Sequence, residues 1–361
     1  MSIIVFIIIL GILVLVHEFG HFIAAKKNGV RVEEFGFGFP PRVFSKKVGE
    51  TIYSINLFPI GGFVKLFGEE YHEIKTTGNQ KPVVKDQSRA FVYKKPWQKA
   101  SIIIAGVIGN FLLGWLVISF LFTQGVPTPI NKVQVEKVQP GSPAGVAGLR
   151  AKDFVVELQK DGKKYSLTSP NDLTLLTQKF LGQKVTLLVE RGGGKFTVEL
   201  VPRIDPPKGQ GPLGVVITSP FIEKKYPWYQ APFYGLIEAF NITRKIVTEL
   251  GKVLIQLVTL QKPKVDVAGP IGIAQYTGQA IKFGKNAVLE LLALLSLNLA
   301  VINIFPFPAL DGGRLVFVIY EWVTKKRVNQ TFERYLNVVG FGLLLTLAAL
   351  VTINDLIKIY R

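Results

Sequence analysis

Four long apolar stretches alternate with more polar segments along the chain. They are residues 1–25, 100–122, 289–307 and 336–353. A helix needs about 20 predominantly apolar residues to cross the hydrocarbon core of a bilayer, and all four stretches are close to that length. The pattern therefore predicts a polytopic α-helical membrane protein with four transmembrane helices.

The first apolar stretch has no Lys or Arg in front of it. A secretory signal peptide would begin with a positively charged segment and would carry a shorter apolar core. We therefore expect residues 1–25 to be retained as a membrane helix.

The segment 30–68 alternates apolar and polar residues and is punctuated by Gly and Pro. Alternation with a period of two is the pattern of β-strands, and Gly and Pro favour the turns between them. We expect a membrane-associated β-hairpin region here, with several apolar residues that dip into the membrane interface. The stretch that follows, up to about Gln87, is predicted to be a loop.

Residues 126–204 differ in character from the rest of the chain. Short alternating strands surround a helix whose N-cap is Ser169 or Asn171, and a Gly-rich hairpin follows. These elements predict a small inserted α+β domain. Within it, VQPGSPAGVAGLRAKDFVVEL resembles the ligand-binding region of bacterial PDZ domains, although Lys152-Asp153 stands where those domains usually have Gly-Asp.

Apolar residues also dominate the segment 231–260. Five charged side chains interrupt it, namely Glu238, Arg244, Lys245, Glu249 and Lys252. Each charge at the centre of a bilayer would cost about 3 kcal/mol, so we expect an amphipathic helix on the membrane surface or against the soluble domain. The chain then divides into four predicted parts, which are 1–125, 126–204, 205–286 and 287–361.

The chain carries 43 Lys and Arg against 25 Asp and Glu, and it has no Cys. The lack of Cys excludes disulfides and thiolate zinc sites. The basic residues occur in every hydrophilic segment without the aromatic interleaving of an RNA-binding sheet, so no nucleic acid is expected as a partner. Basic loops follow the first and third apolar stretches, which predicts that these loops are cytoplasmic and that the PDZ-like domain is extracytoplasmic.

The sequence HEFGH at 17–21 is an H-E-x-x-H motif inside the first apolar stretch. On a helix, the i, i+4 spacing places His17 and His21 on one face, where both can bind one zinc ion while Glu18 acts as the general base. Ionisable residues in a membrane helix are costly unless they form such a site. The alternative is a helix that ends at Val16 and leaves the motif in water, but the apolar residues 22–25 count against it.

A zinc hydrolase needs a third protein ligand and one open position. The candidates are His72, in a polar loop, and Asp311, in the sequence NIFPFPALDGG at 303–313. Pro306 and Pro308 break the third apolar helix and let the chain turn a side chain toward a neighbouring helix. Interpreted as structure alone, the same sequence would be an ordinary helix end with an exposed Asp311.

Helix rise distinguishes these two interpretations of Asp311. At 1.5 Å per residue, residues 3–16 span about 21 Å and residues 291–305 span about 22 Å. The first and third helices are expected to run in the same direction, so the motif and Asp311 reach a similar depth, about two-thirds of the way across a ~30 Å core. Both features therefore predict one zinc site nearer the cytoplasmic face.

Taken together, HEFGH, FPIGGFVKLFGE, GVIGN at 106–110, the PDZ-like insert and NIFPFPALDGG resemble the bacterial site-2 protease family. These are intramembrane zinc metalloproteases, here of the RseP type with one PDZ domain, and the resemblance covers essentially the whole chain. It implies that Asp311 is the third zinc ligand and that Asn303 helps to hold the substrate or the oxyanion. It suggests a similar role for Asn110, although Val107 replaces the usual Pro.

The resemblance also implies a location and partners. The protein would lie in the lipid bilayer of the bacterial cytoplasmic membrane, with its active site toward the cytoplasmic side. Its substrates would be single-pass membrane proteins already shortened by another protease, such as anti-sigma factors or remnant signal peptides. By a separate argument from the strand pattern, the edge of the 30–68 hairpins, with Gly61 and Gly62, could pair with a locally unwound substrate.

Two functions of other classes compete with this hypothesis. One is a scaffold that presents a PDZ module and keeps the histidines for structure. The other is a zinc transporter or sensor, which would need polar residues at more than one depth of the bundle. The fourth apolar stretch offers no ionisable residue from 343 to 351.

Overall fold

The computed structural model describes residues 2–69, 87–259 and 269–359. The chain forms two compact units. One combines Met1–Thr123 with Tyr226–Arg361, and the other is Gln124–Lys225. The loop predicted after residue 68, with His72, lies almost entirely outside the described residues.

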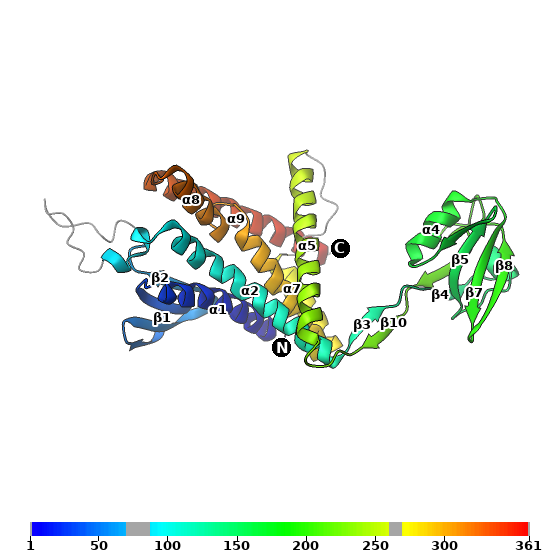
Figure 1. Cartoon of the computed structure of the whole chain (residues 1–361), viewed down its shortest axis with the longest axis horizontal. Helices are drawn as coiled ribbons and strands as arrows, with labels where there is room; N and C mark the ends of the chain where they lie inside the picture. The colour runs from blue at the N-terminus through cyan, green and yellow to red at the C-terminus, as the bar shows by residue number, and fades with distance from the viewer. Residues whose placement is uncertain (1, 70–86, 260–268, 360–361) are drawn as a thin grey trace. The chain divides into compact units, whose positions relative to one another are not determined.

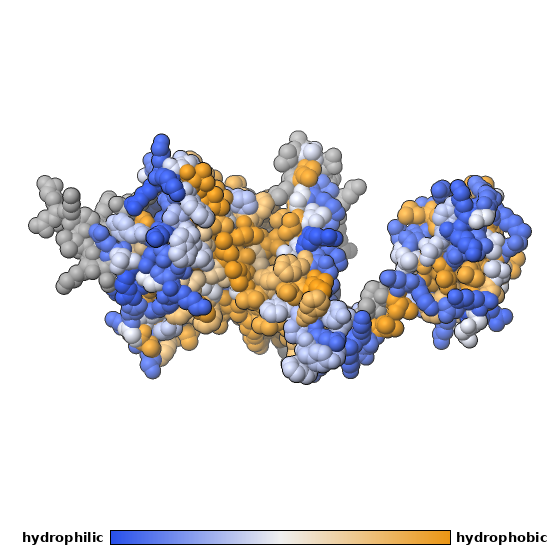
Figure 2. Space-filling view, viewed as in Figure 1, coloured by the Kyte–Doolittle hydropathy of each residue, from blue (hydrophilic) through white to orange (hydrophobic). Residues whose placement is uncertain are grey.

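The first unit contains four long apolar helices (Figure 1). They are α1 (Ser2–Lys27), α2 (Pro96–Gln124), α7 (Lys285–Ile304) and α9 (Gln330–Ile359). Within the described residues, these four are long and apolar enough to cross a membrane. Figure 2 shows apolar side chains gathered on the outside of this unit, as a lipid-facing surface requires. The prediction of four transmembrane helices is therefore confirmed.

The β-hairpin region is present and folds into one antiparallel sheet. Its strands are β1 (Val32–Val48) and β2 (Thr51–Leu66). Both strands bend, so that four segments lie side by side in the order 62–66, 32–37, 51–56 and 42–48. We call residues 62–66 the edge strand, because among the described strands only segment 32–37 pairs with it. Two short 3-10 helices, Gln87–Arg89 and Phe91–Tyr93, then lead into α2.

The amphipathic segment forms α5 (Ala231–Val258), which packs against α2 and α7. Ala239 is fully buried among residues of these helices. Trp115 Nε1 donates a hydrogen bond of 2.8 Å to the carbonyl of Pro232. Part of α5 thus packs against two membrane helices, a contact that the sequence pattern did not predict, while Phe233, Phe240 and Ile255 remain exposed.

Two further helices of this unit did not follow from the sequence pattern. One is α6 (Pro270–Phe283), where Asp355 of α9 accepts a hydrogen bond of 2.8 Å from the Gly272 N–H and satisfies one of the first backbone donors. The other is α8 (Asp311–Thr324), in place of the predicted helix end and basic loop. The prolines before it and the Gly pair in its first turn obscured the helical period of DGGRLVFVIYEWVT.

The second unit is an α+β fold with its own hydrophobic core. Its sheet has the order β8-β7-β5-β4-β9, with β6 paired to β5. These strands are β4 (Val133–Val138), β5 (Phe154–Lys160), β6 (Lys163–Ser166), β7 (Val185–Arg191), β8 (Gly194–Leu200) and β9 (Val215–Thr218). A separate ribbon pairs β3 (Val126–Pro129) with β10 (Phe221–Lys224).

Helices of the second unit are the short α3 (Pro143–Val146) and the longer α4 (Pro170–Lys179). Ser169 is the N-cap of α4, and Asn171 lies inside the helix. The Ser169 side chain accepts from the Asp172 N–H, and the Asp172 carboxylate accepts from the Ser169 N–H at 2.8 Å. Strand β9 extends the sheet beyond residue 204, where the predicted domain ends. A Pro- and Gly-rich segment separates β9 from the strands that the sequence pattern revealed.

Asp153 joins the loop before β5 to the end of β7. It is 1% exposed, and its carboxylate accepts hydrogen bonds of 2.6 Å from Arg191 Nε and Nη2 and of 2.7 Å from the Arg150 N–H. Burial alone would raise the pKa of Asp153, but these hydrogen bonds outweigh it and hold the pKa below its ordinary value. The stability that this carboxylate contributes is therefore complete above about pH 4 and is lost as the pH falls through the lower pKa of the folded state.

We expect Arg191→Ala to destabilise the second unit at neutral pH, because the Asp153 carboxylate, which is 1% exposed, loses its charged partner. The difference from the unmodified protein should shrink below about pH 4, where Asp153 becomes protonated. Hydrogen exchange of peptides from 124–225, measured at several pH values and corrected for intrinsic rates, checks this. Lys184→Ala, which removes an exposed ion pair with Glu199, is the control and should change little. A difference that does not vary with pH would contradict the prediction.

Candidate metal centre

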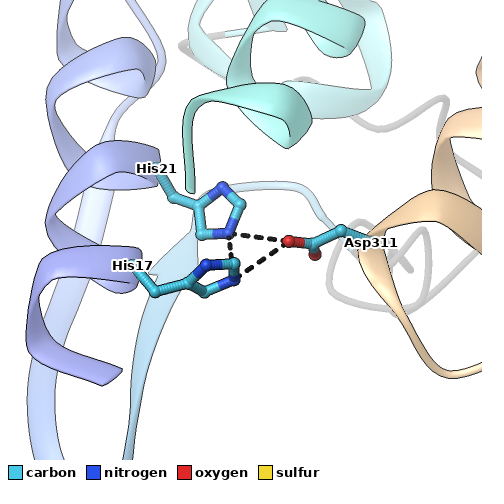
Figure 3. Close-up of side chains that lie close together, drawn as sticks. All are labelled: His17, His21 and Asp311. Atoms are coloured by element: carbon cyan, nitrogen blue, oxygen red, sulfur yellow. Dashed lines mark hydrogen bonds and ion pairs between the residues drawn. The ribbon is translucent and has the colours of Figure 1, made fainter. Parts of the chain in front are cut away.

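Two histidines of α1 and one carboxylate of α8 converge on one point (Figure 3). His17 and His21 are one helical turn apart on α1, and Asp311 is the first residue of α8. The Asp311 Oδ2 atom lies 3.0 Å from His17 Nε2 and 3.2 Å from His21 Nε2, and the two ring nitrogens are 3.2 Å apart. Asp311 thus lies beside both histidines, while the other candidate, His72, lies outside the described residues.

The three side chains suit a single zinc ion. Imidazole nitrogens and a carboxylate oxygen are the ligands of hydrolytic zinc sites, which keep one further position open. In a tetrahedral site with bonds of about 2.05 Å, ligand atoms lie roughly 3.3 Å apart, close to the 3.0–3.2 Å seen here. The Asp311 Oδ2 atom is also buried without a hydrogen-bond partner, which a bound cation would explain.

Hydrogen bonds from the far side of each ring orient the two histidines. The Nδ1 atom of His21 lies 2.8 Å from the Ile102 carbonyl, so Nδ1 carries the proton and Nε2 is left to bind a metal. The Asn110 amide nitrogen lies 3.3 Å from His17 Nδ1, and its Oδ1 atom is buried without a partner. With the amide turned over, Oδ1 would accept from His17 Nδ1–H and hold this ring in the same tautomer.

The remaining predicted site residues lie at different distances from this point. Asn303, near the end of α7, has its amide nitrogen 3.2 Å from His17 Nε2. Gly62 is beside Glu18, because a Cβ atom added to Gly62 would be 3.3 Å from Glu18 Cγ. Gly61 has a φ of +102° and faces Phe39, and it does not line the cavity at the histidines.

A cavity of about 230 Å³ adjoins the three converging side chains. Glu18 lines it together with His17, His21 and Asp311, so a further carboxylate lies beside the candidate metal-binding atoms. Segment 62–66 forms one wall through Gly62, Phe63, Val64 and Leu66. The cavity therefore combines a candidate metal-binding triad, a candidate base and the edge strand.

Sequence reasoning missed two charged residues in the lining of this cavity. Arg314 of α8 and Glu69, just after the edge strand, both line it and form an ion pair with each other. The spacing of Arg314 three residues after Asp311 was the available signal, because it equals about one helical turn. This spacing could not be interpreted from the sequence, because the helix α8 that contains both residues was not predicted.

This fold and this donor set define a membrane-embedded metal-dependent hydrolase. The chain belongs to peptidase family M50, whose family model matches residues 5–347. It is a zinc metalloprotease and a multi-pass membrane protein. The resemblance to the bacterial site-2 protease family that the motifs indicated is thereby confirmed.

Several relatives are similar to this chain over almost its whole length. A Clostridium perfringens protein named as a zinc metalloprotease is 36% identical, over 96% of this chain and 95% of its own. The zinc metalloprotease RasP of Geobacillus kaustophilus is 30% identical, over 99% and 98%. The regulator of sigma-W protease RasP of Bacillus subtilis is 28% identical, over 99% of each chain.

Among solved structures, the PDZ domain of an SdrC-like protein from Listeria innocua is similar to part of this chain. It is 24% identical with a TM-score of 0.20, and the match covers 24% of this chain and 92% of that domain.

Proposed function

We propose that this protein hydrolyses peptide bonds in the transmembrane segments of single-pass membrane proteins. His17, His21 and Asp311 hold the zinc ion in this proposal, and Glu18 is the general base. The observation that carries it is the position of the triad. His17 and His21 lie on a helix apolar enough to cross a membrane, and Asp311 shares one cavity with them, with Glu18 and with the edge strand. A zinc site in that setting meets peptide segments that come from the bilayer.

A zinc ion held by the triad would lower the pKa of a water molecule and polarise a peptide carbonyl. Glu18, which lines the same cavity, would act as the general base that takes a proton from the attacking water and would pass a proton to the leaving amine. The Asn303 amide, 3.2 Å from His17 Nε2, is near enough to donate a hydrogen bond to the carbonyl oxygen as negative charge develops there. Ile102 and Asn110 keep the imidazoles in orientation.

A helical substrate hides its carbonyls in its own hydrogen bonds and must unwind locally before it can react. The edge strand lies along one wall of the cavity, and no second strand of the described residues pairs with its outer side. An unwound segment that pairs with it gains main-chain hydrogen bonds in place of those that it loses. In our proposal Gly62 lets this segment pass close to Glu18, while Gly61 contributes to the bend of β2.

The orientation and the substrates belong to the same proposal. The basic loops after the first and third transmembrane helices favour a cytoplasmic position for these loops. The metal centre then lies toward the cytoplasmic side of the bacterial inner membrane, and the second unit is extracytoplasmic. As a PDZ-like domain, that unit would restrict access to membrane proteins already shortened by another protease, such as anti-sigma factors or signal-peptide remnants. The sigma-regulating relative favours the first of these classes.

Metal removal tests the proposal. Purified protein in detergent or liposomes, incubated with a model single-span substrate, should cut within the transmembrane segment, as mass spectrometry of the products would reveal. Dialysis against a zinc chelator should stop the cleavage, and added zinc should restore it. Cleavage that survives chelation, or cuts confined to the segments outside the membrane, would refute the assignment.

A further inference from the structure

An ion pair links the edge strand to the helix that carries Asp311. Arg314 lies about one turn after Asp311 on α8, and its Nη2 atom donates to Glu69 Oε1. Glu69 follows the edge strand by three residues, and its other carboxylate oxygen accepts from the Leu66 N–H at 3.4 Å. One carboxylate thus contacts both the last residue of the edge strand and α8.

Both members of this pair line the cavity of the metal centre. Arg314 and Glu69 lie on the same cavity as His17, His21 and Asp311. The edge strand and α8 form different walls of that cavity, and they come from positions about 250 residues apart in the sequence. The pair therefore connects the wall that would hold a substrate backbone to the wall that supplies the third metal ligand.

The far end of α8 is fixed independently. Lys99, at the start of α2, is 7% exposed, and its Nζ atom donates to Glu321 Oε2 at 2.9 Å. The Arg314–Glu69 pair is more open, with side chains 40% and 21% exposed. Exposed ion pairs contribute little to global stability, and the Lys99–Glu321 pair still holds α8 when Arg314 is replaced. The protein should therefore fold without the Arg314–Glu69 pair.

We propose that Arg314 is a positioning residue, which acts through Glu69 to hold the edge strand at a fixed spacing from the zinc ligand Asp311. This inference rests on the proposed function, because the spacing matters when a substrate paired with the edge strand must place one carbonyl at the metal. Misplacement of reacting groups by about 1 Å can cost on the order of 100-fold in rate. Arg314 does not touch the substrate in this scheme.

Kinetics of single and double variants test the proposal. Arg314→Ala and Glu69→Ala should each lower kcat by about 10- to 100-fold, with little change in KM or in bound zinc. The double variant should be no worse than either single variant, because both remove the same contact. Arg314→Lys should retain part of the rate. The control is Arg42→Ala, which breaks a comparable pair with Glu34 in the same sheet but outside the cavity, and it should cleave normally.

Three results would overturn the proposal while the unmodified protein still cleaves its substrate. One is a normal kcat in the Glu69→Ala variant together with a lowered kcat in the Arg314→Ala variant. Another is a rise in KM without a loss of kcat, which would make Arg314 a substrate ligand. The third is a double variant whose loss is the product of the single losses. A failure of the unmodified protein to cleave would instead count against the proposed function.

A distance measurement gives a second, activity-independent test. The chain has no Cys, so Lys65→Cys on the edge strand and Val316→Cys on α8 can carry spin labels without background. Both side chains are about half exposed, at 49% and 46%. The label-to-label distance distribution should broaden when Arg314→Ala is added and should stay unchanged with Arg42→Ala. An unchanged distribution in the Arg314→Ala protein would refute the positioning role.

Discussion

The variant Glu18→Gln should lose about 1,000-fold in kcat while it keeps its zinc and its fold. A glutamine side chain has the same shape as glutamate but cannot take a proton from water, and general-base catalysis typically contributes 100- to 10,000-fold. The metal should remain, because Glu18 is not among the three converging ligands. Cleavage of a single-span substrate, together with the metal content of the purified protein, measures both effects.

Glu249→Gln is the matched control for this substitution. Glu249 lies on α5, its side chain is 49% exposed, and it pairs with Lys252 outside the cavity. The control should cleave as the unmodified protein does. If Glu18→Gln also cleaved normally, Glu18 would not be the base, and a scaffold that keeps its histidines for structure would become the better hypothesis.

The proposed ligand set could be chosen from the sequence because each part is a local signal. The spacing of His17 and His21 fixes their shared face once the segment is a helix. The proline break before Asp311 marks a chain that turns within the membrane layer. Helix rise then placed both features at a similar depth. That depth argument needed no knowledge of which helices are neighbours, and for that reason it could not predict the distances that join Asp311 to the two histidines.

The elements around the ligands were harder to predict, because they depend on contacts between distant segments. Alternation in 30–68 predicted β-hairpins but not their order, which is set by bends that let 32–37 pair on both sides. The order of the four segments in the sheet determines that residues 62–66 lie at its edge. Gly61 and Gly62 were equivalent in the sequence, yet Gly62 lines the cavity and Gly61 does not. Strand β9 was missed because its four residues are too short a pattern to distinguish from a loop.

The second large effect concerns the contact between α1 and α2. Gly106 of α2 lies directly against the imidazoles of His17 and His21, the proposed metal ligands. A Cβ atom added to it would contact His21 Nε2, and it would come within 2.6 Å of His21 Cε1 and 2.8 Å of His17 Cε1. Real Cβ atoms do not approach other atoms so closely, so one of the two histidines or the whole of α2 must move.

We therefore expect Gly106→Ala to bind zinc at least 100-fold more weakly and to lose most of its activity. The substitution should favour the helix itself by about 1 kcal/mol, because Ala has the higher helix propensity. This gain in helix stability cannot restore the geometry of the two histidines. Even changes to the hydrogen-bond partners of metal ligands lower metal affinity 10- to 100-fold. Zinc titration of the metal-depleted protein and substrate cleavage are the measurements.

Gly342→Ala on α9 separates this steric effect from the general effect of replacing a helical glycine. A Cβ atom at residue 342 meets no atom within 4 Å, so this variant should keep its zinc and its activity. Gly109→Ala adds a second comparison. Its Cβ atom would lie 2.8 Å from the Val16 carbonyl oxygen and would push α1 from α2 without touching an imidazole. If Gly106→Ala bound zinc as well as Gly342→Ala does, α2 would not confine the two histidines, and their geometry would have to come from α1 and α8 alone.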